Sequence, residues 1–168
     1  MSLAKLTGCM IAYYSDPRRI EHSLKVYAYA LGVGGEEGFA GEDMMVLGAA
    51  ALLHDIGIPT ARVRFGPDPT GCHHEAEGER LTPGFLEQAG IPRTCWQRIG
   101  GLVGRHHAAS GDPVEPLLQL LREADFLVNL VEGNLPGFTP RAVYENEFRT
   151  DTGKRYLRAL YPDRLGRP

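Results

Sequence analysis

The sequence has few cysteines and no long apolar run, and each absence excludes a class of protein. Its 168 residues include three cysteines, at widely separated positions and without a CxxC pair, so a disulfide framework is not expected: Cys9, Cys72 and Cys95. A reducing, cytoplasmic location fits this cysteine usage best. The N-terminal stretch lacks the arrangement of a signal peptide, and no segment approaches the roughly 18 apolar residues of a membrane span. We therefore expect no membrane partner.

An excess of positive charge is also missing. Eighteen Lys and Arg residues stand against 21 Asp and Glu residues, for a net charge of -3. This balance gives no general attraction for a nucleic-acid backbone, so a duplex is not an expected partner, and an anionic substrate would have to be held by local cations. The length and the 43% apolar content suit one globular domain with a real core. We predict a single domain over residues 1–168.

Strand signals are lacking, and helix signals dominate. No run alternates with period two for long enough to support a sheet, whereas Asp16-Pro17 is typical of a helix start and precedes apolar residues at helical spacing. The sequence therefore predicts an all-α fold. In the first half of the chain we expect a helix over 17–31, a glycine-rich loop over 32–41, a helix ending near 54 and an irregular connection over 59–72. A helix from 73 should kink or restart at 82–83, and a capping box at 94–97 should open the next helix. An apolar helix starting at 112 or 115 and two short helices at 141–148 and 153–160 complete the prediction.

What the sequence does contain is an ordered set of histidines and aspartates. The six histidines are His22, His54, His73, His74, His106 and His107. Imidazole nitrogens and carboxylate oxygens are common ligands of first-row divalent metals. Asp125 lies on an apolar helix face, where burying a bare carboxylate costs on the order of several kcal/mol. Taken alone, it could equally lie at the helix rim, but with His54 and Asp55 nearby a shared metal is the better explanation.

The spacing of these residues is compatible with one metal or with two. Neighbours on a helix diverge by about 100°, yet His54 and Asp55 can converge on an ion just beyond a helix end. His22, His54, Asp55 and Asp125 would form a mononuclear set. His74 and His106 extend it toward two metals bridged by Asp55, with a metal-activated water as nucleophile. For His73 and His107, an outer hydrogen bond, a substrate contact or simple exposure is favoured.

These residues resemble a known family. After His22, the sequence contains in this order the motifs His54-Asp55-Ile56-Gly57, His74-x-x-x-Gly78, His106-His107 and Ala124-Asp125. This pattern is similar to the HD superfamily of metal-dependent phosphohydrolases in its HDIG form. The similarity spans roughly residues 18–132. It implies a small stand-alone HD-domain helical bundle with a metal site between helices, a core over about 16–132 and a C-terminal helical extension over 133–168.

The resemblance also implies roles for individual residues. The core metal ligands would be His22, His54, Asp55 and Asp125, and the additional ligands of binuclear branches would be His74 and His106. The implied cofactor is a divalent metal, with two ions per chain, and Fe, Mn, Co, Ni and Mg are not distinguished. Asp55 and His107 are the catalytic candidates, His107 as a substrate or third-metal contact. The candidate substrate-binding cations are Arg19, Lys25 and Arg105, with Arg62 and Arg64 as further possibilities.

The sequence departs from the motifs of two branches of this superfamily, and these departures narrow the range of expected substrates. No Lys follows His54-Asp55 and no Gly-Tyr-Pro follows His106-His107, which disfavours cyclic dinucleotide hydrolysis. No Glu-Asp pair follows soon after Asp55, which disfavours guanosine-tetraphosphate hydrolysis. The leading hypothesis is a phosphohydrolase that acts on a nucleotide or another small phosphate ester. The alternatives are an HD-type di-iron oxygenase, which shares this ligand pattern, and a non-catalytic nucleotide- or metal-binding module. The oligomeric state is not predicted.

Overall fold

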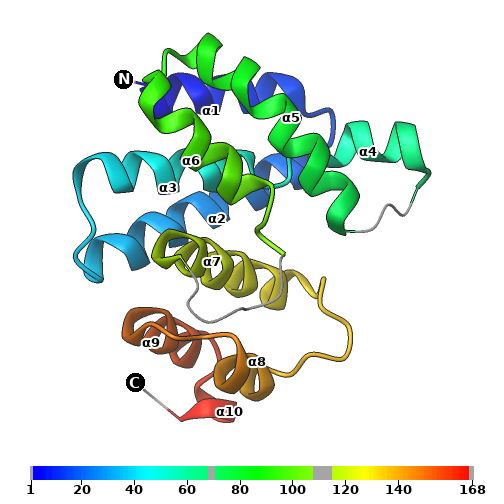
Figure 1. The fold of residues 1–168 in the computed structure, drawn as a ribbon. Helices are drawn as coiled ribbons and strands as arrows, with labels where there is room; N and C mark the ends of the chain where they lie inside the picture. Colours follow the sequence, from blue (N-terminus) through cyan, green and yellow to red (C-terminus); the bar gives the residue numbers. More distant parts are fainter. Residues whose placement is uncertain (1, 68–70, 108–114, 167–168) are drawn as a thin grey trace.

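The computed structural model describes residues 2–67, 71–107 and 115–166, and these ranges contain α-helices joined by turns and no β-strand (Figure 1). The all-α prediction is confirmed. The helices are α1 (Ser2–Tyr13), α2 (Pro17–Glu36), α3 (Gly41–Leu53), α4 (Ile58–Phe65), α5 (Gly71–Ala89), α6 (Arg93–Val103), α7 (Pro116–Glu132), α8 (Pro140–Asn146), α9 (Asp151–Leu160) and α10 (Pro162–Leu165).

Helix α3 is the centre of the core. It packs against α2, α6, α1 and α7, and α5 lies against α6, α1 and α4 (Figure 1). The second half of α3 is completely buried, and its small side chains Ala49, Ala50 and Ala51 allow close helix packing. Within the described residues, the segment Gly41–Phe65 is long and apolar enough to cross a membrane by composition. However, 78% of its most apolar window is buried inside the molecule, as in a core helix.

Helix α2 begins as predicted and ends later than predicted. The Asp16 side chain accepts a hydrogen bond from the Arg18 backbone N–H, and Pro17 opens the helix. The prediction of a loop over 32–41 was wrong for residues 32–36, because α2 continues to Glu36, and the connection to α3 is confined to residues 37–40. A Cβ at Gly32 would lie 3.1 Å from the Tyr156 hydroxyl, and one at Gly34 would lie 2.9 Å from Leu47. These glycines allow close packing and do not mark a turn.

Three other predicted segments differ from the structure. Helix α4 occupies much of the expected irregular connection, with Pro59 in its first turn, where proline is tolerated. Helix α5 starts at Gly71 and continues past Pro83 without restarting. Helix α6 begins after Pro92, so Thr94 lies in its first turn and not at a capping box. The sequence analysis also missed α1 and α10. Of the two expected starts for α7, the structure has Glu115-Pro116; Asp112-Pro113 lies outside the described residues.

The C-terminal helices pack on α7 around a second small core. Leu127, Val143, Phe148 and Leu157 form its buried part. The fully buried carboxylate of Glu123 accepts hydrogen bonds from the backbone N–H groups of residues 149 and 150 and from the Thr150 hydroxyl. Thr150 in turn caps α9. The Thr150–Gly153 region therefore holds the extension against α7.

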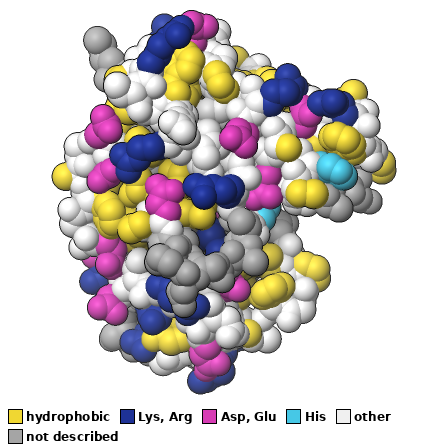
Figure 2. All heavy atoms as spheres, viewed as in Figure 1, with side chains coloured by type: hydrophobic (Ala, Val, Ile, Leu, Met, Phe, Trp, Pro, Cys, Tyr) yellow, Lys and Arg dark blue, Asp and Glu magenta, His cyan; other side chains and the backbone are white. Residues whose placement is uncertain are grey.

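Charges of both signs are mixed on the surface. Figure 2 shows Lys and Arg side chains interspersed with Asp and Glu side chains on the face viewed. Arg98, for example, lies 2.7 Å from Asp43, and Arg105 lies 3.4 Å from Glu115. Among the described side chains of this face, no broad area of positive charge is present.

Candidate metal centre

Six predicted metal ligands converge between five helical segments, although they are spread over more than 100 positions of the sequence. His22 lies on α2, His54 and Asp55 follow the end of α3, His74 is in the first turn of α5, His106 follows the end of α6, and Asp125 lies on α7. All six are buried. The helix ends place the ligands where the sequence analysis expected a shared ion.

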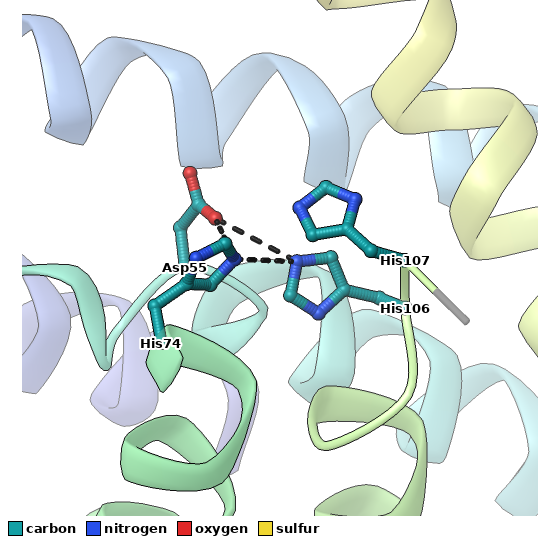
Figure 3. A group of neighbouring side chains, drawn as sticks. All are labelled: Asp55, His74, His106 and His107. Carbon is teal, nitrogen blue, oxygen red and sulfur yellow. Dashed lines mark hydrogen bonds and ion pairs between the residues drawn. The ribbon is translucent and has the colours of Figure 1, made fainter. Parts of the chain in front are cut away.

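The ligand atoms form two groups. His22, His54 and Asp125 each offer an atom within 4.8 Å of the others, and Asp55, His74, His106 and His107 do the same (Figure 3). In the first group, Asp125 Oδ1 is 3.2 Å from His22 Nε2 and 3.6 Å from His54 Nε2. Each group therefore has the donor types of a divalent-metal site.

Asp55 lies between the two groups. Its Oδ2 is 3.9 Å from His22 Nε2 and 3.8 Å from His54 Nε2. Its Oδ1 is 3.6 Å from His74 Nε2 and 3.7 Å from His106 Nε2 (Figure 3). One oxygen thus faces each histidine pair, which is the arrangement of a bridging carboxylate.

The ring orientations show that the cluster fits cations. His54 Nδ1 lies 2.8 Å from the Ala51 carbonyl oxygen, and His106 Nδ1 lies 2.7 Å from the Val103 carbonyl oxygen. A carbonyl only accepts, so each Nδ1 carries a proton and each ring directs its Nε2 at the cluster. Across the two pairs, Nε2 atoms face each other at 3.2 Å for His22 and His54 and 3.4 Å for His74 and His106. Two ring nitrogens this close need a proton or a metal ion between them.

Comparison with known proteins identifies the family. The HD domain model matches residues 19–130, about two thirds of the chain, and this range contains all six ligands. The chain belongs to the HD domain family. A search of solved structures finds a predicted HD superfamily hydrolase from an uncultured Thermotogales bacterium, with a TM-score of 0.69, 20% identity, and coverage of 96% of this chain and 86% of the other. At that identity, the similarity supports the fold alone. No functionally curated protein matches significantly.

Burial and neighbouring charges shift the pKa values of the clustered residues inside this HD domain. Burial disfavours the Asp55 charge, but the nearby charges of His54 and His106 hold its pKa well below the usual range. Burial lowers the pKa of His74 to about 4, so its imidazole is neutral at pH 7. Burial also disfavours charged His22, but Asp125 and Asp55 outweigh it and raise the His22 pKa to about 9. Below that pH, His22 Nε2 therefore carries a proton that a bound metal would replace.

The two histidine doublets are each split by the fold. From the first doublet His74 enters the cluster, while His73 stacks on Phe65 with ring centroids 4.2 Å apart. From the second, His106 is buried and His107 lies beside it at the exposed rim of the same group (Figure 3). Burial within the cluster and the charge of His106 lower the pKa of His107 to about 4. His107 is therefore a neutral imidazole facing the cavity.

The cluster opens into a cavity of about 750 Å³. The lining residues are Asp16, Arg18, Arg19, Glu21, His22, Lys25, Asp55, Ile58, Arg62, His74, His107, Asp125, Asn129, Glu132, Asn134 and Leu135. Of the predicted substrate-binding cations, Arg19 and Lys25 line the cavity. Arg105 lies outside the described lining and hydrogen bonds to the Gly101 carbonyl and to Glu115.

Three polar residues that touch the His/Asp cluster were not identified from the sequence. Asn129 donates to Asp125 Oδ1 at 2.7 Å, Glu75 accepts from the His107 backbone N–H at 2.7 Å, and Glu132 lies 2.9 Å from His22 Nδ1. Asn129 is four residues after Asp125 on the same helix, a spacing that could have revealed it. Glu132 joins α7 to α2 across 110 positions, and only the fold reveals that contact.

Proposed function

We propose that residues 1–168 act as one HD domain that hydrolyses a small phosphate ester with two bound divalent metals. The observation that carries the proposal is Asp55, whose two oxygens each face a separate pair of histidine Nε2 atoms. When bound there, divalent ions supply positive charge for phosphoryl oxygens and lower the pKa of coordinated water. We propose His22, His54, Asp55, His74, His106 and Asp125 as their ligands.

The remaining cavity residues have separate proposed roles. Arg19 donates to Asp55 Oδ2 at 3.0 Å, so it orients the bridging carboxylate and presents the rest of its guanidinium to a substrate phosphate. Arg62 faces the cavity from α4 and is a second proposed phosphate contact. His107 is the proposed catalytic imidazole, because it is neutral and lies at the cavity rim beside the second ligand group.

The charges of the lining favour a phosphomonoester over a polyphosphate. Four Lys and Arg residues line the cavity, and three of them lie close to a carboxylate: Arg18 is 3.1 Å from Asp16, Arg19 is 3.0 Å from Asp55 and Lys25 is 3.0 Å from Glu132. This leaves little uncompensated positive charge for a chain of phosphates. The cavity volume is within the range of small-ligand sites and accommodates a nucleoside monophosphate.

The test is a substrate panel with protein loaded separately with Mg²⁺, Mn²⁺, Fe²⁺, Co²⁺ and Ni²⁺. We expect phosphate release from nucleoside monophosphates or similar monoesters, faster than from dinucleoside polyphosphates. No hydrolysis of any panel member with any metal would overturn the proposal. Turnover with redox-inert Mg²⁺ would exclude the oxygenase alternative. Oxygen consumption with a coupled-iron electron paramagnetic resonance signal would favour it.

Replacing His107 with Gln tests the proposed catalytic imidazole. We expect kcat to fall about 100-fold, the lower end of general acid–base contributions, while two metals per chain remain. His73→Gln is the matched control, because His73 stacks on Phe65 outside the described cavity lining. Its kcat should stay close to that of the wild type. Loss of a metal ion from His107→Gln, measured by elemental analysis, would instead make His107 a ligand.

Removing the metals is expected to destabilise the fold. A ligand at about 100 times its Kd stabilises the folded state by about 2.7 kcal/mol, and a protein of this size shifts by roughly 2–4 °C per kcal/mol. Dialysis against a chelator should therefore lower Tm by roughly 5–10 °C, measured by calorimetry and reversed by adding Mn²⁺. An unchanged Tm after verified metal removal would place the metals outside the core.

We also propose a cytoplasmic location, as the cysteines support. Cys9 and Cys95 are free thiols, and Cys95 is completely buried in the core. A reducing compartment keeps such thiols reduced.

A further inference from the structure

We infer that Glu132, the last residue of α7, is a positioning residue that holds His22 as a ligand of the first metal group. Glu132 Oε2 lies 2.9 Å from His22 Nδ1, on the side of the ring opposite the cluster. The Nε2 of the same ring lies 3.2 Å from both Asp125 Oδ1 and His54 Nε2. Glu132 thus fixes which nitrogen of His22 points at the metal, and it makes that nitrogen a stronger donor. The inference rests on the metal centre proposed above.

His22 differs from the other oriented histidines in this respect. His54 and His106 donate from Nδ1 to carbonyl oxygens three residues earlier in their own helical segments. Those contacts form wherever the local turn forms. His22 instead depends on a charged group from another helix, 110 positions away. The orientation of His22 is therefore coupled to the packing of α2 against α7.

Glu132 is itself held in place on both oxygens. Oε1 accepts from Lys25 Nζ at 3.0 Å, and Oε2 also accepts from Asn134 Nδ2 at 3.1 Å. Lys25 is one turn after His22 on α2, so one helix face supplies both groups that Glu132 binds. With Oε2 directed at Nδ1, Glu132 acts through His22. We call the contacts of Glu132 with His22, Lys25 and Asn134 the clamp. The structure assigns Lys25 to this clamp, which is a different role from the substrate contact expected from the sequence.

The test is a calorimetric titration of the metal-free, full-length protein with Mn²⁺. Glu132→Gln keeps the side-chain shape and an acceptor for Nδ1–H but removes the charge, whereas Glu132→Leu removes both. Outer partners of metal-bound histidines contribute about 10- to 100-fold in affinity. We expect Glu132→Gln to weaken one of the two sites by about tenfold and Glu132→Leu to weaken the same site by about 100-fold, with the other site unchanged.

The matched control is Glu21→Gln. Glu21 lines the same cavity and lies 3.7 Å from Lys25, but its recorded ion pair is with Lys25 and not with a histidine. Both metal sites of the Glu21→Gln variant should bind Mn²⁺ as in the wild type. Lys25→Met should weaken the same site as Glu132→Gln by a smaller factor, because the carboxylate remains. If Lys25→Met left both affinities unchanged, the clamp role of Lys25 would be wrong.

The possible outcomes separate this inference from the proposed function. If the wild type bound no metal, the metal centre itself would be wrong. If the wild type bound two ions and Glu132→Gln bound both with unchanged affinity, only the positioning role would be wrong. Equal weakening of both sites, with a matching loss of Tm, would assign Glu132 to the stability of the α2–α7 interface instead. Should Glu132→Leu fail to fold, Glu132→Gln still decides the question.

Discussion

Replacing Asp55 with Asn is expected to lower kcat/KM by at least about 1,000-fold and to leave the helical content unchanged. Asn has nearly the same shape, but it has one acceptor oxygen in place of two and carries no charge. It therefore cannot face both histidine pairs as the carboxylate does, with Oδ2 toward His22 and His54 and Oδ1 on the other side. Each tenfold loss corresponds to about 1.4 kcal/mol, so the expected loss is about 4 kcal/mol of transition-state stabilisation.

Metal content distinguishes this effect from simple loss of one ligand. Asp55→Asn should hold at most one ion per chain, because its single amide oxygen can face only one of the two groups. Asp125→Asn is the matched comparison, since Asp125 contacts only His22 and His54 among the ligand histidines. It should keep the His74–His106 ion. Two ions per chain in Asp55→Asn, measured by elemental analysis, would show that Asp55 does not bridge.

The convergence of the candidate ligands could be predicted from the sequence because each lies in a short motif whose local geometry is simple. His54 and Asp55 follow a helix end, and Asp125 is a carboxylate on an apolar helix, so the cost of burying its charge indicated a cation. The choice of His74 over His73 also follows helix phase. The sequence was therefore sufficient to predict which residues cluster and that the fold is all-helical.

The remaining features depend on contacts between segments far apart in the chain. Gly32 and Gly34 looked like loop residues, yet they lie inside α2, where Tyr156 and Leu47 pack against them. Arg105 is next to His106 in sequence, but the turn after α6 directs it to Gly101. Local periodicity contains no information on such contacts, and tertiary packing overrides the local preference of glycine.

Replacing Gly57 with Ala is expected to destabilise the protein by about 3 kcal/mol, which corresponds to a fall in Tm of roughly 6–12 °C. The Gly57 backbone is in the right-handed helical region, at φ -78 and ψ -15, so Ala is not excluded by conformation. Ala is excluded because there is no space for its Cβ. A Cβ would lie well inside 3.0 Å of the His74 carbonyl oxygen and the Gly78 nitrogen. Both atoms are backbone, so relief requires a shift of α5.

That shift also affects the metal centre, because His74 lies in the first turn of α5. The glycine of the His-Asp-Ile-Gly motif thus allows the helix that carries a ligand to approach the turn that carries two others. Gly57→Ala should therefore weaken the site formed with His74 more than the site formed with His22.

Gly84→Ala is the matched control on α5, where nothing lies within 4 Å of the added Cβ. It should stabilise the helix by about 0.5–1 kcal/mol. Calorimetric melting of both variants checks that Tm falls for Gly57→Ala and rises for Gly84→Ala. An unchanged Tm for Gly57→Ala would contradict the role proposed for the close contact between Gly57 and α5.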